Sequence, residues 1–261
     1  MKIITSSRQM QRQALQFKRL GRKISFVPTM GALHAGHLSL VRLARKKSDM
    51  VVMSIYVNPT QFGPKEDFSR YPRPFRKDAR LAAAAGVDIL FAPRNLYMPD
   101  DSTQVSESRL SQGRCGRFRP GHFDGVTTVV AKLLNIVQPD VAVFGQKDAQ
   151  QCDVLERMAR DLYFPVQMVR APILRDSRGL AMSSRNAYLS AREYETALNL
   201  SQILNRAAKA GMGSAVARAR KLLSRAPGMK LQYVEAEAGR LCAAVQVGST
   251  RLIDNVPLKV K

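Results

Sequence analysis

Two histidines, His34 and His37, give the strongest chemical signal in this sequence. The chain has 3 histidines, and this pair follows an apolar run at 24–27, at the start of a helix expected over about 37–48. Gly31 and Gly36 beside them let the backbone approach a ligand, and the free N–H groups and positive dipole end of a helix start favour an anion. Imidazoles there can donate hydrogen bonds to phosphoryl oxygens and stabilise charge on a departing phosphate group.

The alternative for each histidine is an ordinary surface or core side chain, since histidines near helix starts are common. The H-x-G-H pattern at a strand-to-helix turn favours a phosphate site, because the local sequence and its expected context agree. A second phosphate-binding group lies at 182–185, where two hydroxyls and a guanidinium follow one another. Alone this segment is an ordinary loop composition, but together with the H-x-G-H pattern it indicates a triphosphate site.

The elements that must position these groups alternate along the chain. Near-continuous β-branched runs separated by helical segments indicate an α/β fold with a parallel sheet covered on both faces. Ligands of such sheets bind at the carboxyl ends of the strands, where polar and glycine residues gather at 28–31, 58–62 and 145–148. The expected strands cover 24–27, 51–57, 87–91, 141–144 and 166–169, and the helices between them include 75–85, 126–137 and 149–162.

The last third of the chain shows a different order of elements. Helical patterns over 191–210 and 214–225 precede strand candidates at 231–236, 243–247 and 251–254, which predicts a small α+β domain over 175–261 after a first domain over 1–174. The segment 109–125 holds four glycines and four arginines and is expected to be a mobile loop. A lid over an anionic substrate is favoured over a plain solvated loop, because arginines and glycines together suit phosphate closure.

Composition narrows the class of protein further. With 261 residues, of which 45% are hydrophobic, the chain can bury a sizeable core. Cys115, Cys152 and Cys242 form no C-x-x-C pair, which argues against a disulfide framework or a structural zinc site. The N-terminus lacks the apolar stretch of a signal peptide and no run approaches the roughly 18 apolar residues of a membrane span, so we expect a soluble, cytoplasmic protein with reduced thiols.

The formal net charge of +22 invites a nucleic-acid hypothesis. Residues 1–48 carry 11 Lys or Arg and residues 196–234 carry 7, with no acid in either segment. These charges are scattered over amphipathic helices, as on a solvated face, and no zinc-finger spacing, RNP-like motif or basic tail accompanies them. We therefore expect no specific nucleic-acid binding, whereas a positive field would attract anionic substrates such as ATP and a carboxylate.

Six motifs follow one another along the chain: Val27-Pro-Thr-Met-Gly-Ala-Leu-His-Ala-Gly-His37, Asn58-Pro-Thr-Gln-Phe62, Tyr71-Pro-Arg73, Arg119-Pro-Gly-His-Phe123, Val143-Phe-Gly-Gln-Lys-Asp148 and Met182-Ser-Ser-Arg-Asn186. In this order they resemble the pantothenate synthetase (pantoate–β-alanine ligase) family, and the resemblance resumes at Arg251-Leu-Ile-Asp-Asn255. The resemblance implies a Rossmann-like domain, a smaller C-terminal domain and a homodimer. It also implies membership of the nucleotidylyltransferase group that shares H-x-G-H with class I aminoacyl-tRNA synthetases.

The reaction implied by this resemblance has two steps. The carboxylate of pantoate attacks the α-phosphorus of ATP with Mg²⁺ assistance, which releases pyrophosphate and leaves a pantoyl adenylate. The amine of β-alanine then attacks the activated carbonyl and expels AMP. Because no protein nucleophile is needed, catalysis rests on positioning and on charge stabilisation.

The resemblance also implies residue roles, with His37 as proton donor, His34 as phosphate ligand and Lys147 as the cation that neutralises phosphate charge. Gln61 and Gln151 match the glutamines that hold pantoate, and Gln61 also lies beside the β-alanine position. The implied ATP-binding residues, in which Asp148 accepts the ribose hydroxyls and the backbone of Leu174 contacts adenine, are Met30, Gly31, Ala32, Leu33, His34, Ala35, Gly36, His37, Gly145, Gln146, Lys147, Asp148, Leu174, Met182, Ser183, Ser184 and Arg185.

The sequence departs from the family pattern in three places. Many relatives have Glu where Gln146 stands, the segment near Cys115 lacks an acid, and an acidic patch after Tyr-Pro-Arg survives as Asp78, so no metal-binding residue is named. Two alternatives stay open: another H-x-G-H nucleotidylyltransferase with a different acceptor, and a basic nucleic-acid-binding protein on the same fold. Gln61 and Gln151 argue against the first, because a phosphate-bearing acceptor would require Arg or Lys.

Overall fold

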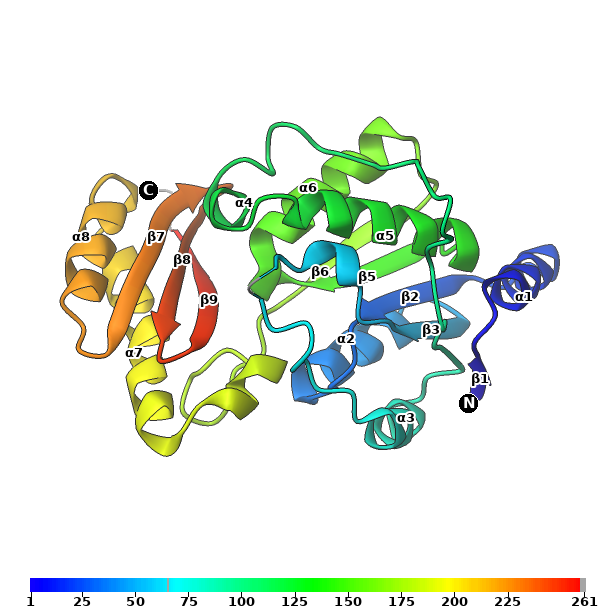
Figure 1. Cartoon of the computed structure of the whole chain (residues 1–261), viewed down its shortest axis with the longest axis horizontal. Helices are drawn as coiled ribbons and strands as arrows, with labels where there is room; N and C mark the ends of the chain where they lie inside the picture. The colour runs from blue at the N-terminus through cyan, green and yellow to red at the C-terminus, as the bar shows by residue number, and fades with distance from the viewer. Residues whose placement is uncertain (65, 259–261) are drawn as a thin grey trace.

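A six-stranded parallel sheet forms the centre of the larger part of the molecule (Figure 1). The computed structural model describes residues 1–64 and 66–258. The strand order is β1-β4-β3-β2-β5-β6, so the order reverses between the neighbours β2 and β5. The predicted α/β fold is thereby confirmed. The strands are β1 (Lys2–Ile4), β2 (Ile24–Thr29), β3 (Met50–Ile55), β4 (Ile89–Phe91), β5 (Val141–Gly145) and β6 (Gln167–Ala171).

Helices cover both faces of this sheet, which explains why its inner strands are continuous apolar runs. Side chains alternate along β2, so that Phe26 packs with the helices of one face and Val27 with those of the other. One face carries α1 (Ser7–Arg19), α5 (His122–Val137) and α6 (Ala149–Asp161), and the other carries α2 (Ala35–Arg45) and α3 (Phe75–Ala84).

The boundaries of some elements differ from those predicted. The helix expected over 37–48 is α2. It begins at Ala35 because the side chain of His34 caps its first turn, and it ends at Arg45. Strand β1 was missed, since three residues are too short to show a period. The helix expected over 126–137 begins one turn earlier, at His122.

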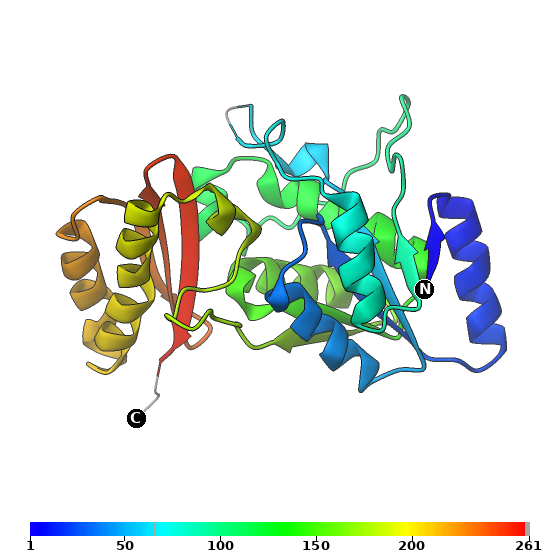
Figure 2. The same cartoon turned by 90° about the horizontal axis from the view of Figure 1, so that it is seen from below.

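A second unit follows, in which a three-stranded antiparallel sheet packs on two helices (Figure 2). Val234 and Ala243 point to the helices, whereas Tyr233 and Cys242 on the opposite face of the sheet pack against the larger unit. The smaller α+β part predicted from the sequence is confirmed, while the division at 174/175 stays a prediction. The elements are α7 (Ala191–Ala208), α8 (Met212–Ser224), β7 (Met229–Glu237), β8 (Arg240–Val247) and β9 (Thr250–Pro257).

The segment 109–125, predicted to be a mobile loop that closes over an anionic substrate, is partly helical in the structure. It contains the short helix α4 (Arg114–Phe118) and the first turn of α5. Arg114 is buried and pairs with Asp153 at 2.8 Å, and the buried Gln150 side chain binds the carbonyl oxygens of Leu110 and Gly113. Three of the four arginines of the segment, Arg114, Arg117 and Arg119, therefore pair with acidic side chains of neighbouring elements.

The three cysteines, Cys115, Cys152 and Cys242, are buried free thiols. Burial raises the pKa of Cys152 to about 12 and that of Cys242 to about 11, so both are protonated near neutral pH. Within the part of the chain that the structure describes, no helix combines the length and apolarity needed to cross a membrane.

Candidate active site

A cavity of about 230 Å³ opens at the carboxyl ends of β2 and β5, where the strand order reverses. Open parallel sheets bind their ligands at this place, because the loops of two neighbouring strands diverge there. The loop after β2 carries the H-x-G-H turn and the loop after β5 carries Lys147. The short 3-10 helices η1 (Pro59–Gln61), η2 (Gln146–Asp148) and η3 (Ser184–Tyr188) bring further polar groups to its walls.

The turn between β2 and α2 is held by Asp78, the acid that the sequence left without a role. Its carboxylate is buried and accepts the N–H groups of Ala32 and Leu33, each at 2.8 Å. These bonds fix a tight turn in which Gly31 and Ala32 both adopt positive φ, at 82° and 49°. Asp78 thus positions the H-x-G-H turn, and both of its oxygens are already engaged there.

The two imidazoles accept backbone N–H groups at the start of α2. Nδ1 of His34 accepts the N–H of Gly36 at 3.1 Å, and Nδ1 of His37 accepts the N–H of His34 at 3.4 Å. Since both Nδ1 atoms accept, each ring carries its proton on Nε2. The expectation of free backbone N–H groups is therefore wrong for His34 and Gly36, because the imidazoles accept these groups. The Nε2–H groups of the two rings are donors that remain at this turn.

The charge state of these rings follows from their surroundings. Burial, and then the positive charge of Lys147, lower the pKa of His34 to about 4. Burial, and then His34 and Lys147, lower the pKa of His37 to about 3. Both imidazoles are accordingly neutral hydrogen-bond donors near neutral pH, and Lys147 supplies the positive charge.

The C-terminal sheet holds the loop that carries Lys147. Nδ2 of Asn255 on β9 donates to the carbonyl oxygens of Gln146 and Lys147 at 2.9 Å and 3.0 Å. The Nζ atom of Lys147 lies 3.5 Å from Oδ1 of Asp148, whose side chain is 45% exposed. The motif at 251–255 is thus explained by contact with the nucleotide loop.

The Ser-Ser-Arg segment closes the opposite wall. Ser184 donates to the carbonyl oxygen of Ala32 at 3.0 Å, which ties this segment to the H-x-G-H turn. Arg185 binds Asp67 through Nε and Nη2, at 2.9 Å and 2.8 Å. This two-pronged pair leaves the Nη1 group without a partner among the described residues.

Gln61 is oriented by two neighbours that belong to the family motifs but were given no role from the sequence. The buried Asn58 donates through Nδ2 to Oε1 of Gln61 at 3.1 Å, so the amide nitrogen of Gln61 faces Sδ of Met30 at 3.2 Å and the cavity. His122 lies 2.8 Å through Nδ1 from the carbonyl oxygen of Gln61 and 2.8 Å through Nε2 from Arg119. Arg119 can only donate, so Nδ1 of His122 carries the proton.

Most of the predicted site residues meet in this cavity, and a few do not. Gly31 and Leu33 are buried behind the turn, Ala35 is exposed, and neither Ala32 nor Gln146 lines the cavity. Asn58, His122 and Asp78 were missed because their roles depend on contacts with residues far away in the sequence. The predicted residues that line it are Met30, His34, Gly36, His37, Gln61, Gly145, Lys147, Asp148, Gln151, Leu174, Met182, Ser183, Ser184 and Arg185.

A parallel sheet with a histidine-capped helix start, a lysine loop and a hydroxyl-guanidinium clamp at its switch point defines a nucleotide-binding α/β enzyme site. Comparison with known proteins narrows this class. The family model described as pantoate-beta-alanine ligase matches residues 2–257. The chain therefore belongs to the pantoate–β-alanine ligase family, as its motifs predicted.

Relatives and solved structures agree with this assignment over the full length. The pantothenate synthetase of Heliobacterium modesticaldum is 50% identical, with 100% of both chains covered, and that of Sulfurihydrogenibium sp. is 48% identical, with 98% and 99% covered. A crystal structure of pantothenate synthetase from Thermus thermophilus matches with a TM-score of 0.92 at 38% identity, covering 100% of both chains. A pantoate-beta-alanine ligase from Francisella tularensis, complexed with beta-gamma ATP and beta-alanine, matches with a TM-score of 0.88 at 33% identity, covering 100% of this chain and 99% of that chain.

Proposed function

We propose that this protein condenses pantoate with β-alanine at the expense of ATP, forming pantothenate, AMP and pyrophosphate through a pantoyl adenylate. One observation carries the chemistry. A single cavity brings the H-x-G-H turn, Lys147 and the clamp at 183–185 together with two neutral amides, Gln61 and Gln151. Phosphate-binding groups and amide donors for a hydroxy acid thus lie around the same space.

In the first step a carboxylate oxygen of pantoate forms a bond to the α-phosphorus, and the bond from that phosphorus to the bridging oxygen breaks. Pyrophosphate leaves with the electron pair, so negative charge grows on the bridging oxygen. The Nε2–H groups of His34 and His37 and the ammonium of Lys147 are the donors nearest this charge in our assignment. We assign His37 the role of hydrogen-bond donor in its neutral form.

In the second step the unprotonated amine of β-alanine attacks the acyl carbon of the adenylate, the bond from that carbon to the phosphate oxygen breaks to expel AMP, and the nitrogen gives its proton to water. Gln61 serves both steps in our assignment, since its amide nitrogen faces the cavity from η1. Gln151, in the first turn of α6, lines the cavity beside Lys147. Holding both reactants in line is, in our assignment, how the site catalyses the reaction without a protein nucleophile.

Mg²⁺ enters this proposal as the counter-ion of ATP rather than as a resident metal. Among the described residues, no group of three or more His, Cys, Asp or Glu side chains could hold a metal ion. Mg²⁺ usually keeps several waters and binds substrate phosphates, so a dedicated protein cage is unnecessary. We also propose a homodimer, a cytoplasmic location, and a functional division into 1–174 and 175–261.

Another H-x-G-H nucleotidylyltransferase activity is disfavoured by the acceptor side of the cavity. A phosphate-bearing acceptor needs cations beside Gln61, but Arg119, which contacts the Gln61 carbonyl oxygen, is held by Glu66 through Nε at 2.7 Å. The charge of Arg119 is therefore already compensated. The neutral hydroxyl end of a hydroxy acid suits the amides of the cavity better than a phosphate group does.

Product analysis tests the proposed function. The purified protein, incubated with MgATP, pantoate and β-alanine, should form pantothenate and AMP in equal amounts, measured by liquid chromatography and mass spectrometry. Replacing pantoate by a phosphorylated alcohol should give no nucleotidyl product. Folded protein that binds ATP yet forms no pantothenate would contradict the proposal.

A further inference from the structure

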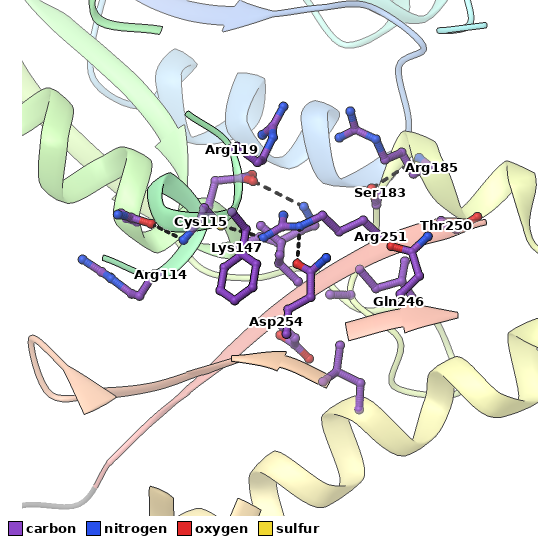
Figure 3. A pocket seen from close by; sticks show the side chains of 18 of the residues that line it. Arg114, Cys115, Arg119, Lys147, Ser183, Arg185, Gln246, Thr250, Arg251 and Asp254 are labelled. Atoms are coloured by element: carbon purple, nitrogen blue, oxygen red, sulfur yellow. Dashed lines mark hydrogen bonds and ion pairs between the residues drawn. The ribbon is translucent and has the colours of Figure 1, made fainter. Parts of the chain in front are cut away.

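A second cavity, of about 310 Å³, lies between the larger unit and the C-terminal sheet (Figure 3). Lys147, Ser183 and Arg185 line both this cavity and the one at the sheet edge. The two spaces therefore meet at the groups that we assign to the phosphates.

Most charges on the walls of this second cavity are already paired. Glu66 pairs with Arg119 and Asp67 with Arg185, so these acids and cations compensate one another. Asp254 binds Arg175 at 2.7 Å on the side of the C-terminal sheet, and Arg114 binds Asp153. The net attraction of the cavity for an anion must come from cations outside these pairs.

Arg251, on β9, is such a cation. Its guanidinium donates through Nε to the neutral amide oxygen of Gln232 at 2.8 Å and through Nη2 to Sγ of Cys115 at 3.3 Å. Among the described residues its side-chain partners are this amide and this thiol, with no carboxylate, although the side chain is half-buried. A half-buried charge without a counter-charge is costly, and an anionic ligand would remove that cost.

The position of Arg251 on β9 also places its side chain at the wall of this cavity. Residues two apart on a strand share a face, so Arg251 lies on the same face of β9 as Asn255, which holds the Lys147 loop. Figure 3 shows Arg251 reaching from the C-terminal strand across the cavity toward Lys147 and Arg119. One strand thus fixes the catalytic lysine loop and presents a further cation to the same space.

We propose that Arg251 binds the pyrophosphate end of ATP and the pyrophosphate product in this second cavity. The inference rests on the proposed function, since it names the group that receives the leaving phosphates. Pyrophosphate offers several anionic oxygens, which suit the two-pronged geometry of a guanidinium. The C-terminal sheet then contributes directly to leaving-group binding, besides covering the site.

Titration calorimetry with inorganic pyrophosphate tests this assignment in the full-length protein. Arg251→Gln should weaken pyrophosphate binding by about tenfold to a hundredfold, the usual cost of one charge-assisted contact, and change AMP binding by less than about twofold. The matched control Lys230→Gln removes an exposed positive charge from the same sheet and should leave both affinities unchanged. Unchanged pyrophosphate binding in Arg251→Gln, or equal losses for pyrophosphate and AMP, would overturn the proposal.

A second variant covers the case in which Arg251→Gln does not fold, which circular dichroism and thermal unfolding reveal. Arg251→Lys keeps the charge but not the guanidinium fork, so its pyrophosphate affinity should fall about threefold to tenfold; a change under about twofold contradicts the proposal. Pantoate-dependent pyrophosphate exchange into ATP separates the two hypotheses. Wild-type protein without exchange refutes the proposed function, whereas normal exchange with the same pyrophosphate KM in Arg251→Gln refutes the role of Arg251.

Discussion

Gly36 lies directly against the imidazole of His34. Its N–H donates to Nδ1 at 3.1 Å, and a β-carbon on Gly36 would stand 2.7 Å from Cε1 and 2.8 Å from Nδ1 of the ring. The glycine of the H-x-G-H pattern is therefore required by the histidine two residues before it. A side chain at this position would displace the ring from its cap on the helix and from the wall of the cavity.

Gly36→Ala should accordingly displace His34 and weaken ATP binding. We expect the KM for ATP to rise by about tenfold, the cost of one lost hydrogen bond to a charged group, measured by steady-state kinetics. Gly213→Ala is the matched control, since nothing lies within 4 Å of its added β-carbon. That control should keep wild-type kinetics and gain up to about 1 kcal/mol of helix stability. Equal ATP KM values in the two variants would refute the role of Gly36.

Gly125 allows α5 to approach η1, the short helix that ends at Gln61. A β-carbon on Gly125 would lie 2.5 Å from the carbonyl oxygen of Thr60 and 2.7 Å from the backbone nitrogen of Gln61. Gly125→Ala should push η1 outward and lower kcat/KM for pantoate by about a hundredfold, because displacements near 1 Å have such effects. Kinetics with pantoate varied at saturating ATP check this, and a loss confined to the ATP KM would contradict it.

His122 bridges the backbone of Gln61 and the guanidinium of Arg119. His122→Ala removes the 2.8 Å contact to the carbonyl oxygen of Gln61 and leaves the longer one from Arg119 at 3.3 Å, so we expect the KM for pantoate to rise by about tenfold. His122→Asn can keep the donor to that oxygen and should lose only a few-fold. Steady-state kinetics of both variants measure this change. A KM for ATP that rises as much as the KM for pantoate would show that His122 stabilises the fold rather than the position of Gln61.

The histidines also predict how stability depends on pH. Burial is the largest cause that lowers the pKa values of His37 and His122 to about 3 and of His34 to about 4, from a usual value of 6.5. The unfolded chain therefore binds more protons below pH 6.5, and the free energy of unfolding falls as the pH drops toward 3 or 4.

Thermal unfolding between pH 7 and 5 measures this effect, since few carboxylates titrate in that range. For the buried His122 the expected loss from pH 6.5 to 5 is about 2 kcal/mol, at about 1.36 kcal/mol for each unit of pH below the unfolded pKa. The Tm should fall over this range, and less steeply in His122→Asn. A Tm that stays constant from pH 7 to 5 would contradict neutral buried imidazoles.

The sheet and its site edge could be predicted from the sequence because both depend on local patterns. Buried parallel strands are apolar runs, and the residues that follow them reach one edge whatever the tertiary details. For this reason the H-x-G-H turn and the loop of Lys147 were predicted at this edge, whereas the clamp at 183–185 was predicted from its hydroxyls and guanidinium and from the family resemblance. All three meet in one cavity.

The remaining parts depend on contacts between distant residues, which spacing does not reveal. Asp78 lies 45 residues from Leu33, whose N–H it binds, and His122 lies 61 residues from Gln61. The helical part of the segment 109–125 was not predicted for the same reason, because Gln150 and Asp153, which hold it, lie on α6. Glycines indicated flexibility there, but one of them, Gly116, permits a close approach to the carbonyl oxygen of Ser111.

Exchange of labelled pyrophosphate into ATP, without β-alanine present, tests the central claim most directly. Formation of the adenylate is reversible, so the protein should return label to ATP when pantoate is added and not otherwise. Addition of β-alanine should then lower the exchange, because the amine diverts the adenylate to pantothenate and AMP. Label incorporation that is independent of pantoate, or none at all from folded protein that binds ATP, would contradict adenylation of pantoate at this site.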